Sequence, residues 1–157
     1  MNVEIRQAKA SDAQRLTAIA FAAKRHWGYS DELINLWKGE LTVTSIYVAS
    51  HRVFSASIND KVVGFCALSQ EDSCYWLDHM WVLPDYIGGG IGRRLLVHAL
   101  RQLNALREGR LSVISDPNAE GFYLKMGFRR VGECGSKPKG RTLPVLELKL
   151  AAGRAFT

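Results

Sequence analysis

The chain has 157 residues, of which 47% are hydrophobic and 23% are charged. This composition excludes a disordered chain, and no apolar run approaches the ~18 residues that a membrane-spanning helix needs. The length suits one domain with a real core, so we expect residues 1–157 to form a single domain. The N-terminus lacks the basic and apolar regions of a signal peptide, and the sequence therefore points to the cytoplasm.

In chain order, we expect the first half to contain a strand, two helices and three strands: 2–7, a helix capped at 11–14, a short helix from Ser30, and strands over 46–56, 61–69 and 74–83. Val3 and Ile5 alternate with polar residues, which predicts the first strand. Apolar residues at helical spacing place Leu33, Leu36 and Trp37 on one face of the second helix.

The clearest amphipathic helix has apolar residues at helical spacing from Ile91 to Leu106, and Gly109 lies just past its end in a usual C-cap position. The elements expected after it are a strand over 111–115, a helix capped by Asp116 or Asn118 and ended by Gly127, and strands over 128–134 and 143–150. The order βααβββαβαββ predicts an α/β (α+β) fold with a mixed, mostly antiparallel sheet, flanking helices and one helical crossover.

The formal net charge of +6 is concentrated near the C-terminus. Residues 1–120 hold 13 basic and 13 acidic residues, whereas residues 121–157 hold 8 basic and 2 acidic residues. A basic region favours nucleic acid or a small ligand that carries phosphates. Aromatic residues are not interleaved with these charges, as a surface for stacking nucleic-acid bases would require.

Three cysteines, Cys66, Cys74 and Cys134, lie far apart in apolar segments. No C-x-x-C pair or nearby histidine indicates a metal site, so we expect no metal. No local histidine–acid pair supports a catalytic role for any of them, so we interpret them as reduced thiols in or near the core rather than as nucleophiles.

A glycine-rich turn is the strongest functional feature of the sequence. It follows a strand and opens the amphipathic helix, and glycine allows both positive φ and the close approach of a ligand to the backbone. Amides in the first turn of a helix bind phosphate oxygens, and Arg93 and Arg94 oppose the helix dipole unless an anion is bound there. The turn lacks the Gly-Lys-Ser/Thr of a Walker loop and the third glycine of a dinucleotide fingerprint. The expected anion-binding residues are Gly88, Gly89, Gly90, Ile91, Gly92 and Arg93.

Two segments resemble the GNAT acetyltransferase superfamily. Residues 82–96 are similar to its signature [Arg/Gln]-x-x-Gly-x-[Gly/Ala] after a Val-x-Pro strand end, with Gly90 and Gly92 at the small positions and Ile87 where Arg or Gln is usual. Residues 116–128 resemble a later segment, Asn-x-x-Ala-x-x-Phe-Tyr-x-x-x-Gly-Phe, in shortened form. The resemblance implies the GNAT-like acyl-CoA N-acyltransferase fold, with acetyl-CoA as cosubstrate. It also implies transfer of the acetyl group to a primary amine of a small molecule or peptide.

The resemblance also implies roles for individual residues. Tyr123 would protonate the leaving thiolate, and Asn118 would contact the pantetheine arm or a nearby phosphate. In the family, a bulge splays the strand that here ends at Val82 from its neighbour in the sheet. The backbone groups freed near Met80 and Val82 would pair with the pantetheine amides like an added strand. The amide of Val82 or of a neighbour would donate to the developing oxyanion.

The general base is less narrowly defined. An acid at the position of Asp78 often serves as the base in related sequences, directly or through water. Strand alternation puts Asp78 and His79 on opposite faces, so we expect one of the two to reach the reacting atoms. Structural roles for both residues, and a reaction with bulk water as the base or with no dedicated base, are the alternatives.

The acceptor residues are indicated by their place in the chain. The segment around Trp27 and Tyr29 usually walls the acceptor pocket in this superfamily, and Trp37 lies on the helix that follows. Arg141, in the basic loop between the last two strands, would bind a carboxylate of the acceptor. Core packing for the aromatic residues, and a solvated loop for Arg141, are the alternatives.

The sequence therefore supports three functional hypotheses. The first is an acetyl-CoA-dependent N-acetyltransferase, and the second is a non-catalytic acyl-CoA-binding sensor with the same cleft. The third is a nucleic-acid or nucleotide-binding module that uses the basic C-terminal region. Dimers are common in such folds, and no feature of this sequence indicates one.

Overall fold

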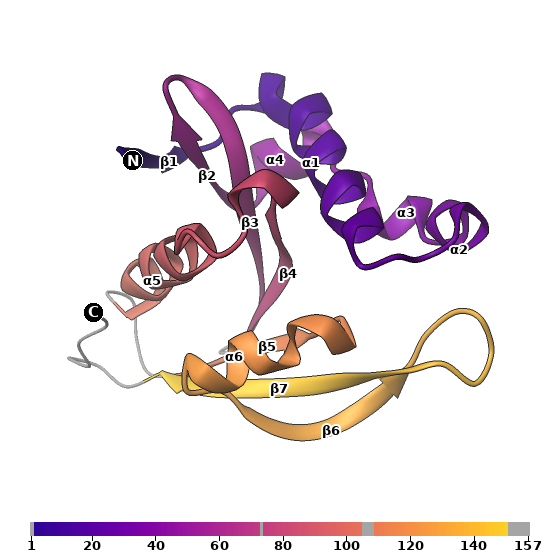
Figure 1. The fold of residues 1–157 in the computed structure, drawn as a ribbon. Helices are drawn as coiled ribbons and strands as arrows, with labels where there is room; N and C mark the ends of the chain where they lie inside the picture. The colour runs from indigo at the N-terminus through magenta and orange to yellow at the C-terminus, as the bar shows by residue number, and fades with distance from the viewer. Residues whose placement is uncertain (1, 73, 105–108, 151–157) are drawn as a thin grey trace. The chain divides into compact units, whose positions relative to one another are not determined.

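The computed structural model describes residues 2–72, 74–104 and 109–150 (Figure 1). In chain order the strands and α-helices are β1 (Val3–Gln7), α1 (Ala13–His26), α2 (Asp31–Leu36), α3 (Lys38–Leu41), α4 (Ser45–Ser50), β2 (Arg52–Ile58), β3 (Lys61–Glu71), β4 (Cys74–Val82), α5 (Ile91–Asn104), β5 (Gly109–Ile114), α6 (Glu120–Lys125), β6 (Arg129–Gly135) and β7 (Thr142–Leu150). Short 3-10 helices precede α1, α5 and α6, at Ala10–Asp12, Pro84–Tyr86 and Pro117–Ala119. No described helix is long and apolar enough to cross a membrane.

The strands that the structure describes form one sheet, in the order β1-β2-β3-β4-β5-β7-β6. β1 pairs with β2, β5 with β7, and β6 with β7 in antiparallel register, whereas β4 pairs with β5 in parallel. Because α5 connects the two parallel strands, the predicted helical crossover is confirmed. The mixed sheet with flanking helices also confirms the α+β class.

The residue contacts divide the chain into two compact units, and the first comprises Met1–Ala67 and His79–Ala99. The core of this unit is a buried apolar cluster drawn from α1, α2, β2 and β3, including Leu16, Ile19, Ile34, Val53 and Phe65. Figure 1 shows α1 beside β3. Arg15 of α1 donates from Nη2 to the carbonyl oxygen of Val62 at 2.9 Å, which ties the helix to that strand.

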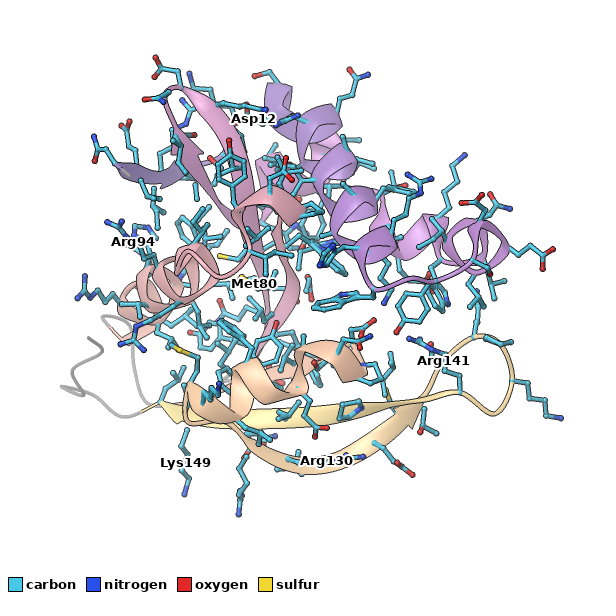
Figure 2. The ribbon with its side chains drawn as sticks, in the orientation of Figure 1. Asp12, Met80, Arg94, Arg130, Arg141 and Lys149 are labelled. Carbon is cyan, nitrogen blue, oxygen red and sulfur yellow. The ribbon has the colours of Figure 1, made fainter. Side chains whose placement is uncertain are left out.

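The second unit comprises Leu68–Asp78 and Leu100–Thr157. Figure 1 shows α6 lying along one face of the sheet formed by β5, β7 and β6. Leu146, Leu148 and Leu150 of β7 alternate with more exposed residues and are buried. Between them Lys149 is exposed, and Figure 2 shows it pointing away from α6. This period of two gives the sheet one apolar and one solvated face. The expectation of a single domain over 1–157 stays a prediction.

The structure corrects the strand predicted over 46–56, because its first residues form helix α4. The hydroxyl of Thr44 accepts a hydrogen bond from the amide of Tyr47 at 3.0 Å and caps this helix. The β-branched and aromatic side chains of this segment suggested a strand, but Ile46 is 79% exposed and only Val48 enters the core. The strand itself is β2 and begins at Arg52.

Two further predictions, a helix cap and one residue of a helix face, are also wrong. Helix α1 is not capped by a box at 11–14: the Asp12 carboxylate accepts from the amide of Lys9 at 2.8 Å instead. Of the predicted face of α2, Leu33 and Trp37 pack in or against the core, but Leu36 is 43% exposed and Ile34 is buried instead. The described part of α5 reaches Asn104 and β5 begins at Gly109, so the C-cap predicted at Gly109 stays a prediction. The expected helical residue Leu106 lies outside the described residues.

Candidate active site

The glycine turn has the backbone conformation that its sequence predicts. Gly88 and Gly90 have φ values of +86° and +83°, in the left-handed region. A Cβ placed on either residue would meet nothing within 4 Å. The glycines are therefore required by backbone conformation and not by crowding from the protein itself. The turn is exposed, and this leaves its backbone accessible to a ligand.

Helix α5 begins directly after this turn. Its first intrahelical hydrogen bond joins the amide of Arg94 to the carbonyl oxygen of Gly90 at 3.0 Å, so the amides of Ile91 and Gly92 lie ahead of that bond. No acidic residue occupies the first turn, and the side chains of Arg93 and Arg94 are exposed. Figure 2 shows Arg94 extending away from the ribbon. A helix N-terminus with two cations and no acid attracts an anion.

Gly64 of β3, which is not among the predicted site residues, sets the position of this helix. A Cβ on Gly64 would lie 3.0 Å from the carbonyl oxygen of Trp81, 3.3 Å from Cγ2 of Ile91 and 3.4 Å from Cδ1 of Leu95. The first turns of α5 therefore press against the backbone of β3. A glycine inside a strand pattern signals such a close approach, so the signal was present in the sequence.

The end of β4 carries Met80 and Val82, both half-buried. β4 pairs in parallel with β5 from Cys74, opposite Arg110, to Trp76, opposite Ser112. β4 itself continues to Val82. Beyond the strand, the amide of Leu83 donates to the carbonyl oxygen of Val63 at 2.8 Å and holds this end of β4 to β3. Met80 and Val82 thus lie on β4 past its paired stretch with β5.

The second unit contains Asn118 and Arg141, which both contact Asp116. The Asp116 carboxylate accepts from the backbone amide of Asn118 at 2.8 Å and from its side-chain Nδ2 at 2.9 Å. Arg141 lies 3.8 Å from the same carboxylate through Nη2, and it donates from Nη1 to Oγ of Ser136 at 2.9 Å. Figure 2 shows Arg141 at the loop end of the β6–β7 hairpin. Asp116 therefore connects this loop to the turn that carries Asn118.

Tyr123 lies on α6 and is only 4% exposed. Its ring makes edge contacts with Phe122, at 5.1 Å between centroids, and with Phe128, at 5.4 Å. These contacts fix the ring, while its predicted role as an acid stays a prediction.

The two candidate bases have different surroundings. Asp78 is exposed, and its carboxylate accepts a hydrogen bond from Oγ of Ser69 at 3.0 Å. His79 is half-buried, and its Nδ1 accepts from the indole N–H of Trp81 at 3.1 Å. Asp78 is therefore the more solvated of the two groups.

The aromatic residues predicted for the acceptor separate into two groups. Tyr29 and Trp37 contact each other edge to face at 4.8 Å between ring centroids, and both contact the ammonium of the buried Lys24, at 5.1 and 4.6 Å. Trp27 is 38% exposed and contacts the ring of His26 instead. No local pattern in the sequence marks Lys24, whose burial results from contacts distant along the chain.

The surroundings of Cys66 do not suit a catalytic thiol. Cys66 is fully buried, and desolvation raises the pKa of its thiol to about 12, although a hydrogen bond from the Phe54 backbone opposes this shift. A thiol that stays protonated is a poor nucleophile. Among the described residues, no group of three or more His, Cys, Asp or Glu residues is placed to hold a metal ion.

Comparison with known proteins gives the family. The family model described as an acetyltransferase (GNAT) domain matches residues 44–130, which is more than half of the chain. The peptidyl-lysine N-acetyltransferase YjaB of Escherichia coli is 31% identical over 76% of this chain and 74% of its own length. YjaB of Salmonella typhimurium is 29% identical over 94% of this chain and 98% of its own.

Solved structures show the same fold. The PaiA N-acetyltransferase of Thermoplasma acidophilum, crystallised in complex with coenzyme A, superposes with a TM-score of 0.75. It is 24% identical and covers 95% of this chain and 99% of its own. The chain belongs to the GNAT acetyltransferase family. It is an N-acetyltransferase that moves an acetyl group from acetyl-CoA to an amine, which confirms the predicted fold, activity and cosubstrate. Nothing in the comparisons favours the non-catalytic sensor.

Proposed function

We propose that this enzyme acetylates lysine side chains of peptides or proteins. The observation that carries the proposal is the pair of curated relatives, both named peptidyl-lysine N-acetyltransferases, one of which matches nearly the whole length of both chains. A lysine side chain is a primary amine, in agreement with the acceptor class expected from the sequence. A free small-molecule amine is the alternative acceptor.

The glycine turn and the start of α5 supply the proposed site for the phosphates of acetyl-CoA. Positive φ at Gly88 and Gly90 shapes the turn, while the first-turn amides and Arg93 provide donors and charge. Backbone groups of Met80 and Val82 are proposed to pair with the pantetheine amides. The remaining proposed cofactor-binding residues are Gly89, Ile91, Gly92 and Asn118.

The proposed chemistry is direct aminolysis of the thioester. The neutral lysine nitrogen attacks the carbonyl carbon, the carbon–sulfur bond breaks, and the sulfur leaves as a thiolate. Asp78 takes the proton released from the attacking nitrogen, directly or through water, which suits its solvated position. Tyr123 gives a proton to the leaving thiolate. The amide at Val82 or a neighbour stabilises the oxyanion.

The proposed acceptor residues are Trp27, Tyr29 and Arg141. The exposed Trp27 offers apolar surface to the methylene chain of a lysine, and the half-buried Tyr29 packs at the edge of the cluster around Lys24. Arg141 is proposed to bind a carboxylate near the acceptor amine, in addition to its contacts with Asp116 and Ser136. We also propose that the enzyme works in the cytoplasm, without nucleic acid as a partner. A homodimer is a further proposal, which light scattering coupled to size-exclusion chromatography tests.

The deciding experiment measures release of free coenzyme A thiol from acetyl-CoA with a panel of acceptors. The panel contains lysine peptides with acidic or neutral flanking residues, the same peptides with the lysine already acetylated, and small mono- and polyamines. Turnover with unmodified lysine peptides, and none with the acetylated controls, is the expected result. Turnover confined to small amines would contradict the lysine proposal and leave the N-acetyltransferase activity intact.

A further inference from the structure

The hydrogen bond between Trp81 and His79 determines where the imidazole carries its proton. The indole N–H of Trp81 lies 3.1 Å from Nδ1 of His79, and an indole nitrogen can only donate. Nδ1 must therefore present its lone pair, which leaves the proton of the neutral ring on Nε2. A doubly protonated imidazolium would set two N–H groups against each other and lose this bond.

Aromatic rings from two other elements border the same imidazole. The ring of Phe65 on β3 lies 5.7 Å away between centroids, and that of Tyr47 on α4 lies 5.9 Å away in an edge-to-face arrangement. Tyr47 in turn stacks on His51, with centroids 3.9 Å apart and 12° between the planes. These contacts restrict rotation of the His79 ring, so the tautomer and the orientation are fixed together.

Trp81 is also held from its face by a buried cation. Nζ of Lys24 on α1 lies 5.9 Å from the centroid of the Trp81 ring, and the contacts of this ammonium with Tyr29 and Trp37 are shorter. Lys24 is only 7% exposed, so these cation–π contacts act with little screening by water. A cation over the ring draws electron density from the indole and makes its N–H a better donor to His79.

We propose that His79 is a positioning residue for acetyl transfer and not its base. With its proton on Nε2 and its Nδ1 lone pair engaged by Trp81, the ring has no nitrogen with which to accept a proton from the acceptor amine. Its role is to hold Trp81 against Lys24 and so to fix the β4 backbone from His79 to Val82. The kinetic consequence rests on the proposed function, which assigns Met80 and Val82 to the pantetheine arm.

The tautomer is tested without any assay of activity. In protein labelled with nitrogen-15, long-range proton–nitrogen correlation at pH 7 should show His79 with Nδ1 unprotonated and Nε2 protonated. A Trp81→Phe variant should lose this preference, because phenylalanine has no N–H. A Trp76→Phe variant, altered on the same strand, should keep it. A proton on Nδ1, or on both nitrogens, in the unaltered protein would overturn the proposal even if the enzyme acetylates lysine as proposed.

Two variants separate positioning from base catalysis. In His79→Asn, the side-chain oxygen takes the place of Nδ1 and still accepts from the indole, whereas His79→Leu has a similar bulk and no acceptor. We expect His79→Asn to keep kcat within about twofold, and His79→Leu to raise the KM for acetyl-CoA several-fold. Both variants should keep the shape of the pH profile of kcat. The titratable groups around His79, which would shape that profile in its place, are Lys24, Tyr47, His51 and Asp78.

A base would behave differently. Loss of kcat by about 10²-fold or more in His79→Asn, with loss of the acidic limb of its pH profile, would identify His79 as the base and overturn the proposal. Unchanged kinetics in His79→Leu would remove the positioning role. If His79→Leu does not fold, the His79→Asn kinetics and the nitrogen spectrum of the unaltered protein still decide the question.

Discussion

The carboxylate of Asp116 accepts two hydrogen bonds from Asn118, one from its backbone amide at 2.8 Å and one from its side-chain Nδ2 at 2.9 Å. The second bond fixes which way the amide group of Asn118 points and directs its oxygen away from Asp116. We therefore predict that Asp116→Ala raises the KM for acetyl-CoA several-fold and lowers the free energy of unfolding by about 1–2 kcal/mol through loss of the cap. Steady-state kinetics and urea unfolding measure the two effects.

Asp116→Asn is the matched control for this prediction. It keeps an oxygen that accepts from Asn118 and loses only the charge that faces Arg141 at 3.8 Å. Its KM for acetyl-CoA should stay close to that of the unaltered enzyme. If Asp116→Asn is as impaired as Asp116→Ala, the charge and not the orientation of Asn118 is what matters.

Gly90 should tolerate no side chain, although the space around it is empty. With φ at +83°, an alanine would carry strain of about 1–2 kcal/mol at the start of α5, or the turn would rearrange. We predict that Gly90→Ala weakens coenzyme A binding by about tenfold or more, measured by calorimetry, and lowers Tm.

A second glycine provides the comparison. Gly121 lies within α6 without a positive φ, and a Cβ there also meets nothing within 4 Å. Gly121→Ala should therefore raise stability by about 0.5–1 kcal/mol, because alanine is the better helix former. Equal effects of the two substitutions would show that backbone conformation is not what Gly90 supplies.

The charge of Arg93 should act in opposite directions on binding and on stability. Arg93→Gln removes a cation from the positive end of the α5 dipole, which favours the unliganded fold by about 0.3–1 kcal/mol. The same change should weaken coenzyme A binding, by a factor that shrinks as salt rises. Arg101, in the last turn of the same helix, is the control. Arg101→Gln should leave coenzyme A affinity unchanged and slightly lower stability, and a similar loss of affinity there would indicate a diffuse charge effect.

The features that the sequence predicted correctly are those with local causes. The turn at Gly88 and Gly90 follows from backbone conformation, and the period of apolar residues in α5 follows from helix geometry. The strand prediction at Ile46 failed because intrinsic propensity was outweighed by the cap at Thr44, a single hydrogen bond to Tyr47. In a short, exposed segment, strand propensity is therefore a weaker guide to the backbone than a helix cap is.

Other features of the site depend on contacts that no local pattern reports. Lys24 meets Trp37 and Trp81 only because α1 packs against β4 and the junction between α2 and α3, so its burial could not be predicted from its helix alone. The bond between His79 and Trp81 is different, since residues two apart on a strand share a face and alternation could have paired them.

Burial of Cys66 should make stability depend on pH above the physiological range. Burial raises the pKa of this thiol to about 12 in the folded protein, against an ordinary value of 9.0. Between these values the unfolded chain loses the proton and the folded chain keeps it, so stability must fall as pH rises. The slope from this group approaches ~1.4 kcal/mol per pH unit. At pH 7, Cys66→Ala should be less stable than the unaltered protein because of the cavity it leaves. Above pH 9, its free energy of unfolding should fall less than that of the unaltered protein, as urea unfolding at several pH values measures. Parallel stability curves would contradict this assignment.

The Tyr123→Phe substitution is the sharpest test of the catalytic proposal, because the ring is buried and the substitution removes only its hydroxyl group. The edge contacts with Phe122 and Phe128 should persist, so Tm should fall little. If the hydroxyl protonates the leaving thiolate, kcat should fall by about 10²–10⁴-fold with the KM for acetyl-CoA unchanged. Acetyl thioesters of more acidic thiols need less protonation, so the deficit should shrink with them. Phe122→Leu, which alters packing beside the same ring, should show no such dependence on the leaving group. Full turnover in Tyr123→Phe would leave the tyrosine as a core residue.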